Sequence, residues 1–436
     1  MAQQLDRRTF LTGVAFAGVH GGLLAAGRGF AAGGQRGSVG ENHVWTPGRG
    51  AQDLVTQTSV DALPLNSWVK VAGTQLSTLT DALAERGWRI GKSDWSNGKN
   101  IRSTLTPWVG CARDGMRVYY PRGGGHADSS VNGTWIFDLT TMRWDIADMP
   151  SDPAAPGKEW DPVYRKPPTY TRYTGQLPTD DGLYTDMLPD GRPTSAHTYG
   201  GVWFDSKRRC VGTGRVSKWT LDLAMKKWTR ARWTWEGGPP TFFSIQQQLH
   251  YHAGNDAIYG FPARKDIDYY GFGKCPAAGA DWQALRAPPN WAKTDGSSCR
   301  LDADKVLFFW HHGKVDRWGI FDMAKEAWAP GSGTAIGNEE EYRAPSEMKP
   351  AIWVPAWGQH GQVIRRSAGG SQQETWWLFD LATKSNQAYQ PQGARPEKYS
   401  RFPGNKWMGI DEAGLCMMLD DNGPVDQPAV LVMRYR

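Results

Sequence analysis

One short phrase recurs along this chain and constrains its fold more than any other feature. Each copy reads as a strand of alternating apolar residues, a tight turn that contains Asp, and a second strand anchored by Trp. The repeat predicts small antiparallel units that cannot bury both of their faces alone, so neighbouring units must stack. The clearest copies are TWIFDLTTMRW (134–144, preceded by VYYPRGGGH at 118–126), KWTLDLAMKKW (218–228), WGIFDMAKEAW (318–328) and WWLFDLATKSN (376–386).

The spacing of the copies predicts an all-β fold, a β-propeller of the kelch type. A strand unit that returns about every 40–50 residues with Gly-Gly and Trp markers is typical of such propeller blades. We expect six blades, and a central funnel where function should lie. Residues 151–193 are rich in Pro, Tyr and Asp, and we interpret them as a long functional loop, a seventh blade being the alternative. The six blades are expected at about 105–150, 194–234, 242–290, 297–330, 346–390 and 400–436.

The last of these blades lacks an outer strand, and the beginning of the domain supplies one. Residues 65–72 read as an outer strand with no inner strands before it. Residues 400–436 read as inner strands with no outer partner. Pairing the two would close the ring and remove the open sheet edges at the junction.

The N-terminus reads as an export signal. The run from Asp6 to Leu11 holds the twin arginines Arg7 and Arg8, and a Gly/Ala-rich apolar run follows them. We therefore expect residues 1–32 to be a twin-arginine signal peptide, 33–60 a flexible leader and 61–436 the propeller domain. The apolar run is too short to remain as a membrane span. The protein is expected in the periplasm or secreted beyond it.

The amino-acid composition limits the classes of molecule that this protein is expected to bind. The formal net charge is +6, which suits an acidic polymer but is too weak to indicate nucleic acid, and no RNA-binding or basic-helix signature is present. The 23 Trp residues fit packing between blades, with a surplus in loops of the kind that sugar-binding grooves use. We expect a monomer that binds an acidic polysaccharide or oligosaccharide, with no membrane span.

Five cysteines leave an odd count. Cys111, Cys210 and Cys416 lie in strand-like runs and are expected to be buried thiols. Cys275 and Cys299 are the pair that an oxidising compartment would join as a disulfide. A structural zinc held by these two cysteines with His252 or His312 is the alternative, although no CxxC spacing supports it. The predicted chemistry requires no cofactor.

Polar side chains gather at one predicted rim of the funnel. Aligning the blades brings the ends of the second strands and the starts of the first strands to the same face. The alternative for His126 and Arg215 is that they cap blade turns. Tyr251 and His252 fall on the opposite face, where we expect structural roles. The candidate rim residues are His126, His197, Tyr199 and Arg215 for catalysis, and Asn132, Gln246, Arg264, His312 and Arg401 for substrate binding.

This set of side chains fits β-elimination at a uronic acid. An Arg can neutralise the carboxylate next to the acidic C5 proton, and His or Tyr can take that proton and protonate the leaving oxygen. The sequence shows no believable Ser-His-Asp order, HExxH, phosphate loop or dinucleotide fingerprint. No group of Asp and Glu falls on this rim to bind calcium or form a glycosidase pair.

The first two predicted blades resemble the propeller polysaccharide lyases that cleave ulvan and related uronate polymers. The resemblance rests on GGGH at 123–126, HTY at 197–199 and Arg215. It implies that His126 and Tyr199 are the base and acid candidates and that Arg215 neutralises the carboxylate. A second family His downstream of GGGH has no evident match, and His197 is the substitute.

Two other functional classes stay open. The first is a non-catalytic carbohydrate-binding propeller. The second is a copper radical oxidase similar to galactose oxidase, for which Tyr251 and His252 form an adjacent pair, although the crosslinked Cys–Tyr and the distant His cannot be placed.

Overall fold

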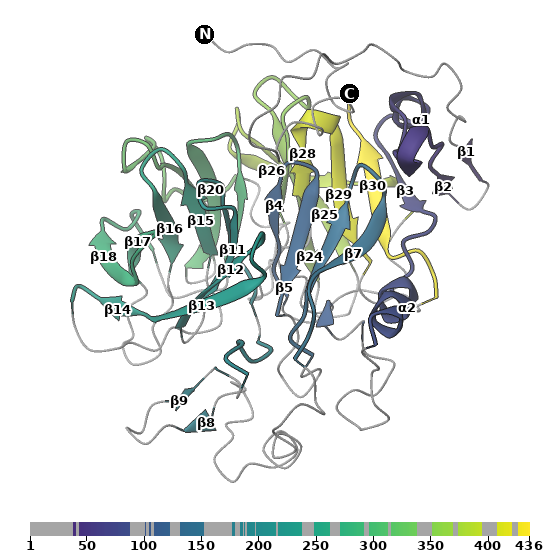
Figure 1. Ribbon diagram of the computed structural model, residues 1–436. Coiled ribbons are helices and arrows are strands. Elements are labelled where there is room, and N and C mark those ends of the chain that lie inside the picture. Colours follow the sequence, from purple (N-terminus) through teal and green to yellow (C-terminus); the bar gives the residue numbers. More distant parts are fainter. Residues whose placement is uncertain are drawn as a thin grey trace, which may run out of the picture.

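The computed structural model confirms an all-β propeller. It describes residues 38–40, 43–87, 101, 104–105, 109–122, 131–151, 177–178, 184–185, 187, 190–196, 198–214, 217–237, 248–261, 271–291, 296–312, 315–337, 351–368, 374–394, 408–420 and 426–436. Figure 1 shows the strands gathered in sheets that follow one another around the molecule.

Five sheets in the described chain are blades built from consecutive strands, in the places that the repeat predicts. Blade 1 holds β4 (Ala112–Asp114), β5 (Arg117–Pro121), β6 (Thr134–Asp138) and β7 (Arg143–Asp148). Blade 2 holds β10 (Val202–Asp205), β11 (Cys210–Gly214), β12 (Ser217–Asp222) and β13 (Lys227–Arg232). Blade 3 holds β15 (Gln248–His252), β16 (Ala257–Phe261), β17 (Phe272–Pro276) and β18 (Asp281–Leu285), with β14 (Thr234–Trp235) parallel to β18.

Blade 4 holds β19 (Ser297–Arg300), β20 (Lys305–His312), β21 (Val315–Asp322) and β22 (Ala327–Trp328). Blade 5 holds β23 (Ala351–Val354), β24 (Gln362–Ala368), β25 (Glu374–Asp380) and β26 (Ser385–Tyr389). All neighbouring strands of these two blades pair antiparallel.

The sixth predicted position holds a composite sheet of seven strands, so the described chain has five regular blades rather than the six expected. β28 (Met408–Ile410), β29 (Leu415–Leu419) and β30 (Val430–Arg434) come from one end of the described chain. β1 (Ser38–Val39), β2 (Val44–Thr46) and β3 (Ser67–Val71) come from the other, and β27 (Gln392–Gly393) pairs with β3. β3 pairs antiparallel with β30, so the strand pairing expected for residues 65–72 is present.

Part of the predicted flexible leader is folded onto this sheet, which corrects that expectation. β2 pairs in parallel with β3, and a short helix, α1 (Gln57–Asp61), follows it. Trp45 and Val55 are fully buried. A small number of apolar residues is enough to anchor a Gly-rich segment when an unpaired strand edge lies next to that segment. A second helix, α2 (Ser77–Glu85), buries Leu79 and Leu83 in the same core.

The repeated phrase has a specific local structure. In each copy the Asp that ends the third strand accepts backbone hydrogen bonds from the turn, as Asp222 Oδ1 does from Ala224 N (2.9 Å) and Met225 N (2.8 Å). The turn ends on a residue in the left-handed region, such as Lys226 with φ of 52°. The Asp side chain mimics a backbone turn and so favours this hairpin. The equivalent left-handed residues are Met142, Glu326 and Lys384.

The Trp that follows each of three turns joins one sheet to the preceding one. Trp228 Nε1 donates to Asp148 Oδ2 of blade 1 (2.7 Å), and Trp328 Nε1 donates to the Arg286 carbonyl just after blade 3 (2.9 Å). Trp144 Nε1 donates to the Thr74 carbonyl just after β3 (2.9 Å). A Trp with a buried ring and a satisfied N–H fixes both the spacing and the orientation of neighbouring sheets.

Hydrophobic clusters pack each sheet against its neighbours. Two of them involve the composite sheet, which packs on blade 1 through Trp135 and Met417 and on blade 5 through Trp68 and Trp376. Because the sheets bury their faces in this way, the core is a series of interfaces around a central axis.

Of residues 151–193, the structure describes no four-stranded unit. It describes β8 (Leu177–Pro178) and β9 (Tyr184–Thr185), which pair with each other and lie below the blades in Figure 1.

Candidate functional site

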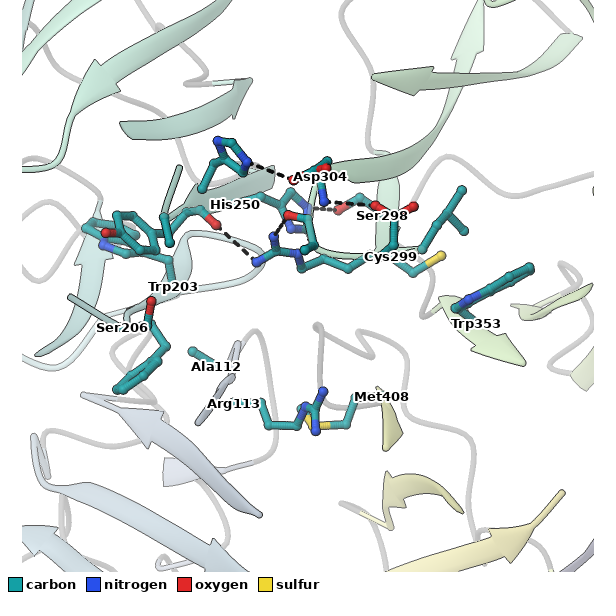
Figure 2. Close-up of a pocket in the computed structure, with 18 of the residues that line it drawn as sticks. Ala112, Arg113, Trp203, Ser206, His250, Ser298, Cys299, Asp304, Trp353 and Met408 are labelled. Atoms are coloured by element: carbon teal, nitrogen blue, oxygen red, sulfur yellow. Dashed lines mark hydrogen bonds and ion pairs between the residues drawn. The ribbon is translucent and has the colours of Figure 1, made fainter. Parts of the chain in front are cut away.

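A central cavity of about 890 Å³ is lined by the first strands of all five blades and by β28 of the composite sheet (Figure 2). Because the first strand of each sheet is the innermost, its side chains and the turn after it face the axis. The polar lining residues are Arg113, Asp114, Ser206, His250, His252, Asn255, Ser298, Arg300, Asp302, Asp304, Asp411 and Glu412.

A hydrogen-bond chain runs from the cavity wall into blade 4. Ser298 Oγ donates to Gln248 Oε1 (2.7 Å), and Gln248 Nε2 donates to the Gly296 carbonyl (3.1 Å). Since the hydroxyl proton of Ser298 is used in this way, His250 Nε2 must donate to Ser298 Oγ, 2.8 Å away. Burial, reinforced by the charge of Arg300, lowers the pKa of His250 to about 3. His250 is therefore neutral at pH 7.

Two arginines extend into the cavity. Arg113, at the centre of β4, donates from Nη1 to Glu412 Oε2 (2.6 Å) and to the Gly115 carbonyl (3.1 Å). Arg300, at the end of β19, donates to two carbonyl groups, those of Tyr251 (3.0 Å) and Ala303. Burial opposes ionisation of Glu412, but the charge of Arg113 and its hydrogen bond prevail and lower the pKa of that carboxyl.

Each carboxylate of the lining already has a partner. Asp114 pairs with Arg209 (2.9 Å), and Asp302 pairs with Lys305 (3.2 Å). Two others are hydrogen-bonded, Asp304 to His252 Nε2 (3.1 Å) and Asp411 to the Tyr435 hydroxyl (2.8 Å). Each of these carboxylates therefore has a fixed donor, and the cavity presents hydrogen-bond acceptors in set positions.

Tyr251 and His252 line the cavity and make hydrogen bonds within the protein, as expected of structural side chains. His252 accepts from Asn255 N at Nδ1 (3.1 Å) while bonding Asp304 at Nε2, so both ring nitrogens are used. The Tyr251 hydroxyl donates to Asp256 Oδ1 (3.0 Å). As successive strand residues the two side chains point to opposite sides of β15, and they do not form the pair that the copper oxidase alternative needs.

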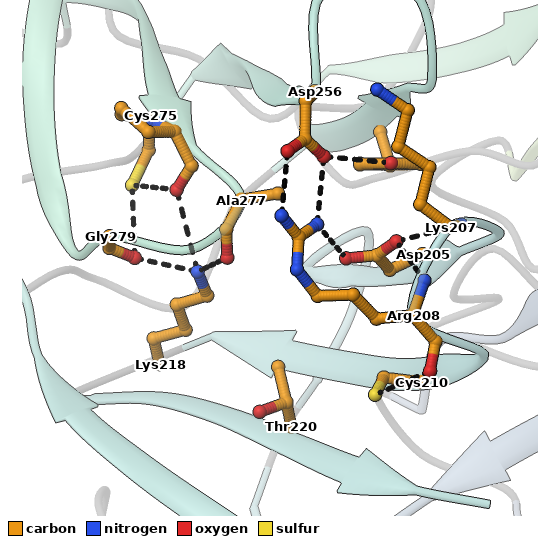
Figure 3. A network of polar contacts seen from close by, with 12 residues as sticks. Asp205, Lys207, Arg208, Cys210, Lys218, Thr220, Asp256, Cys275, Ala277 and Gly279 are labelled. Atoms are coloured by element: carbon orange, nitrogen blue, oxygen red, sulfur yellow. Dashed lines mark hydrogen bonds and ion pairs between the residues drawn. The ribbon is translucent and has the colours of Figure 1, made fainter.

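The partner of Tyr251 belongs to a clamp between blades 2 and 3 (Figure 3). Arg208 donates to both oxygens of Asp256 (2.7 and 2.6 Å) and to Asp205 Oδ2 (2.8 Å). The hydrogen bonds from Arg208 lower the pKa of Asp256 to about 2. In the same view Lys218, which is buried, donates to the carbonyls of Ala277 and Gly279.

At the opposite mouth, where the first strands begin, Tyr199 is buried and lies in the turn before β10. Its backbone is in the left-handed region, with φ of 42°. The neighbouring Thr198 Oγ1 accepts from Gly110 N (2.8 Å), and a Cβ on Gly110 would lie 1.6 Å from the Tyr199 carbonyl oxygen. This turn requires glycine at position 110.

Asn132 lies in the interior of the fold, and its role in substrate binding stays a prediction. Its side chain is buried, donates to Ser151 Oγ (2.9 Å) and the Pro193 carbonyl (2.8 Å), and accepts from Ser151 N (2.8 Å). An amide that joins three backbone segments in this way has a structural role.

The other rim residues cannot be located from the described part of the chain. His312 ends β20, but the structure describes only its backbone. The predicted convergence of these side chains therefore stays a prediction. Outside the described residues lie His126, His197, Arg215, Gln246, Arg264 and Arg401.

Cys275 and Cys299 are free thiols that lie in different hydrophobic clusters, so they do not form the disulfide considered above. Burial raises the pKa of both thiols to about 12. Among the described residues, no group of three or more His, Cys, Asp or Glu side chains is arranged to hold a metal ion.

The charged lining of the cavity was not predicted from the sequence. The sequence-based candidates belong to the mouth where the first strands begin. Arg113, Arg300 and the carboxylates lie instead along the first strands and in the turns that follow them. The available signal was the accumulation of charge at equivalent turns, in RD at 113–114, RLDAD at 300–304 and DE at 411–412.

No protein-family model matches the sequence, and no curated protein matches it. Three solved structures are similar at a TM-score of 0.34. A GH74 xyloglucanase from Xanthomonas campestris is 11% identical over 66% of this chain, which spans 39% of that one. A mutant of the Aleuria aurantia lectin in complex with alpha-methyl-L-fucoside is 9% identical over 67% of this chain and 79% of its own. The Dos1 propeller is 12% identical over 76% of this chain and 75% of its own.

These similarities are too weak to assign a family or a function, and the propeller assignment follows from the sheets themselves. No helix in the described part of the chain is long and apolar enough to cross a bilayer.

Proposed function

We propose that this chain is an exported polysaccharide lyase that cleaves a uronic-acid-containing polymer by β-elimination. The reaction is proposed at the mouth where the first strands begin. The single observation that carries the proposal is the constrained position of Tyr199 in the turn that enters β10 at that mouth.

The constraint on Tyr199 comes from both sides of its peptide. A bulky residue with positive φ costs roughly 1–3 kcal/mol, and such strain gathers at functional sites. Gly110 allows the close approach of the Tyr199 carbonyl, and Gly200 forms a bridge to Gln248 of blade 3. A rigid turn between two blades supports a role in which the phenol must be held still.

The proposed chemistry divides three tasks among the candidate side chains. Arg215 neutralises the uronate carboxylate and stabilises the charge that develops when the C5 proton leaves. His126 takes the proton, Tyr199 protonates the leaving oxygen, and His197 is the substitute acid–base group. The elimination involves no external oxidant or reductant, so the reaction requires no cofactor.

The alternative function is a non-catalytic carbohydrate-binding propeller. The central cavity favours it, because its volume and its fixed donors and acceptors suit a sugar whether or not the other mouth is catalytic.

The test is incubation of the mature protein with a panel of uronate polysaccharides, following the ultraviolet absorbance of the unsaturated product. Tyr199→Phe should lower turnover about 10²–10⁴-fold, the usual contribution of a general acid or base, with little change in melting temperature. Arg215→Lys should lower it about 10²–10³-fold, since Lys lacks the planar two-pronged geometry.

Tyr251→Phe is the matched control, because it removes a hydroxyl from the clamp and not from the proposed site. It should lower the melting temperature and leave turnover near normal. Near-normal turnover in both Tyr199→Phe and a His126→Ala variant would refute the lyase proposal, and a protein without activity on any substrate would favour the binding alternative.

A further inference from the structure

Arg300 is a cation of the central cavity with an unusual set of partners. It is exposed within the lining, and its side chain makes no ion pair in the described part of the chain. Its two hydrogen bonds go to the carbonyls of Tyr251 and Ala303. A guanidinium has five N–H donors, so this geometry leaves donors available to a ligand.

Among the described residues, the charge of Arg300 is offset only by carboxylates that make no ion pair with it. Its pKa is lowered by burial, the largest cause, while Asp302 and Asp304 raise it and Arg113 lowers it further. Arg113 lies across the opening from His250 and Ser298 in Figure 2. Since Arg113 is already paired with Glu412 and His250 is neutral, an anionic group entering the cavity would find its complement at Arg300.

The carboxylates around Arg300 limit how many negative charges a ligand in the cavity can carry. Three carboxylates of the lining, Asp302, Asp304 and Glu412, expose about half of their side chains (48%, 53% and 51%). Paired carboxylates of this kind accept further hydrogen bonds from hydroxyl groups but repel additional negative charge. The cavity therefore favours a ligand with a single carboxylate and several hydroxyls over a polyanion.

An aromatic side chain completes the lining. Trp353 of β23 is partly exposed and lines the cavity. Figure 2 shows it beyond Ser298 and Cys299, on the side of blade 5. An indole with an accessible surface offers an apolar contact for a sugar ring, while its neighbours bind the hydroxyls.

We propose that the central cavity is a binding site for a short acidic saccharide, with one carboxylate held by Arg300 and the hydroxyl groups held by the carboxylates around it. This site lies along the first strands and in the turns after them. It is separate from the mouth proposed for the lyase reaction and does not depend on that reaction. A charge-assisted pair of this kind corresponds to about a 10- to 100-fold gain in affinity over a ligand without the carboxylate.

The experiment measures binding of two probes that differ only at C6, methyl α-D-galacturonoside and methyl α-D-galactoside, by isothermal titration calorimetry. The wild-type protein should bind the uronoside at least about 10-fold more tightly. Polygalacturonate should not displace it at equal uronate concentration. Arg300→Gln should remove the preference by weakening uronoside binding while leaving galactoside binding unchanged.

Arg143→Gln is the matched control, since Arg143 pairs with Asp53 and neither residue lines the cavity. It should keep the preference for the uronoside. If Arg300→Gln does not fold, Arg300→Lys retains the charge and should give an intermediate preference that weakens with added salt. Tyr199→Phe should bind like wild type, so loss of lyase activity and loss of this site are distinguishable.

Equal affinity of wild type for the two probes would overturn the proposal, as would the absence of binding to either probe at about 10 mM. An Arg300→Gln variant that folds and keeps the full preference would also overturn it.

Discussion

His250 should make the stability of this protein depend on pH in the acidic range. Its folded-state pKa is about 3 because burial disfavours the imidazolium, with a further contribution from Arg300. The ordinary pKa of His in an unfolded chain is about 6.5. Between these two values the unfolded state binds a proton that the folded state does not, so the stability contributed by neutral His250 is lost as pH falls.

The size of the effect follows from the two pKa values. One proton changes the free energy of unfolding by about 1.4 kcal/mol per pH unit within this window. Lowering the pH from about 7 to about 4.5 should therefore cost the wild-type protein about 2.5 kcal/mol through His250. The effect should be nearly absent above about pH 7, where both states hold neutral imidazole.

The assay compares urea unfolding of wild type and His250→Gln at about pH 7 and about pH 4.5. Gln retains an N–H donor that can reach Ser298 Oγ but does not titrate, so the acid-induced loss should be smaller by about 2.5 kcal/mol in the variant. Other groups with shifted pKa values, such as Asp256, are present in both proteins and cancel in the difference. Equal losses of stability in the two proteins would refute the assignment of a depressed pKa to His250.

Three further predictions concern the turn at Tyr199, export and the composite sheet. Gly110→Ala should destabilise the fold by about 1–3 kcal/mol or more and reduce activity, because its Cβ would collide with the Tyr199 carbonyl; an unchanged melting temperature would contradict this. Changing Arg7 and Arg8 together to Lys should block export while leaving the domain folded, and normal periplasmic levels on fractionation would count against the twin-arginine prediction. Deleting 61–72 removes β3, and we expect insoluble protein; a soluble variant with a cooperative melting transition would argue against the predicted ring closure.

The positions of the blades were predictable because the turn chemistry is local. In the second blade, Asp222 and the residues after it specify the hairpin through hydrogen bonds within four residues, and Trp228 marks the strand that contacts the preceding sheet. Such signals repeat in sequence because each blade meets the same requirement. The leader was harder to predict, since Trp45 is buried in a cluster that also holds Val430 and Val432, from the other end of the described chain.

The candidate site was predictable only in part. The alignment of the blades placed Tyr251 and His252 next to the turn after β15, where both make the hydrogen bonds expected of structural side chains. Arg300 could not be identified in this way, because its environment includes the Tyr251 carbonyl of blade 3 and Arg113 of blade 1. The burial of Asn132 was not predictable, because the residues that satisfy its amide, Ser151 and Pro193, are distant in sequence.

The composite sheet also sets a limit on how this protein is made. Val430 N donates to Thr74 Oγ1 across a sequence separation of 356 residues, close to where β30 pairs with β3. At a synthesis rate of about 5–20 residues per second, β3 waits on the order of 20–70 seconds for this partner after it is translated. During that interval the edge of β3 that pairs with β30 is open, and Trp68 has not yet packed into its hydrophobic cluster. The composite sheet is therefore completed only once residues 430–434 have been translated, and until then residues 67–71 present an open strand edge to other chains.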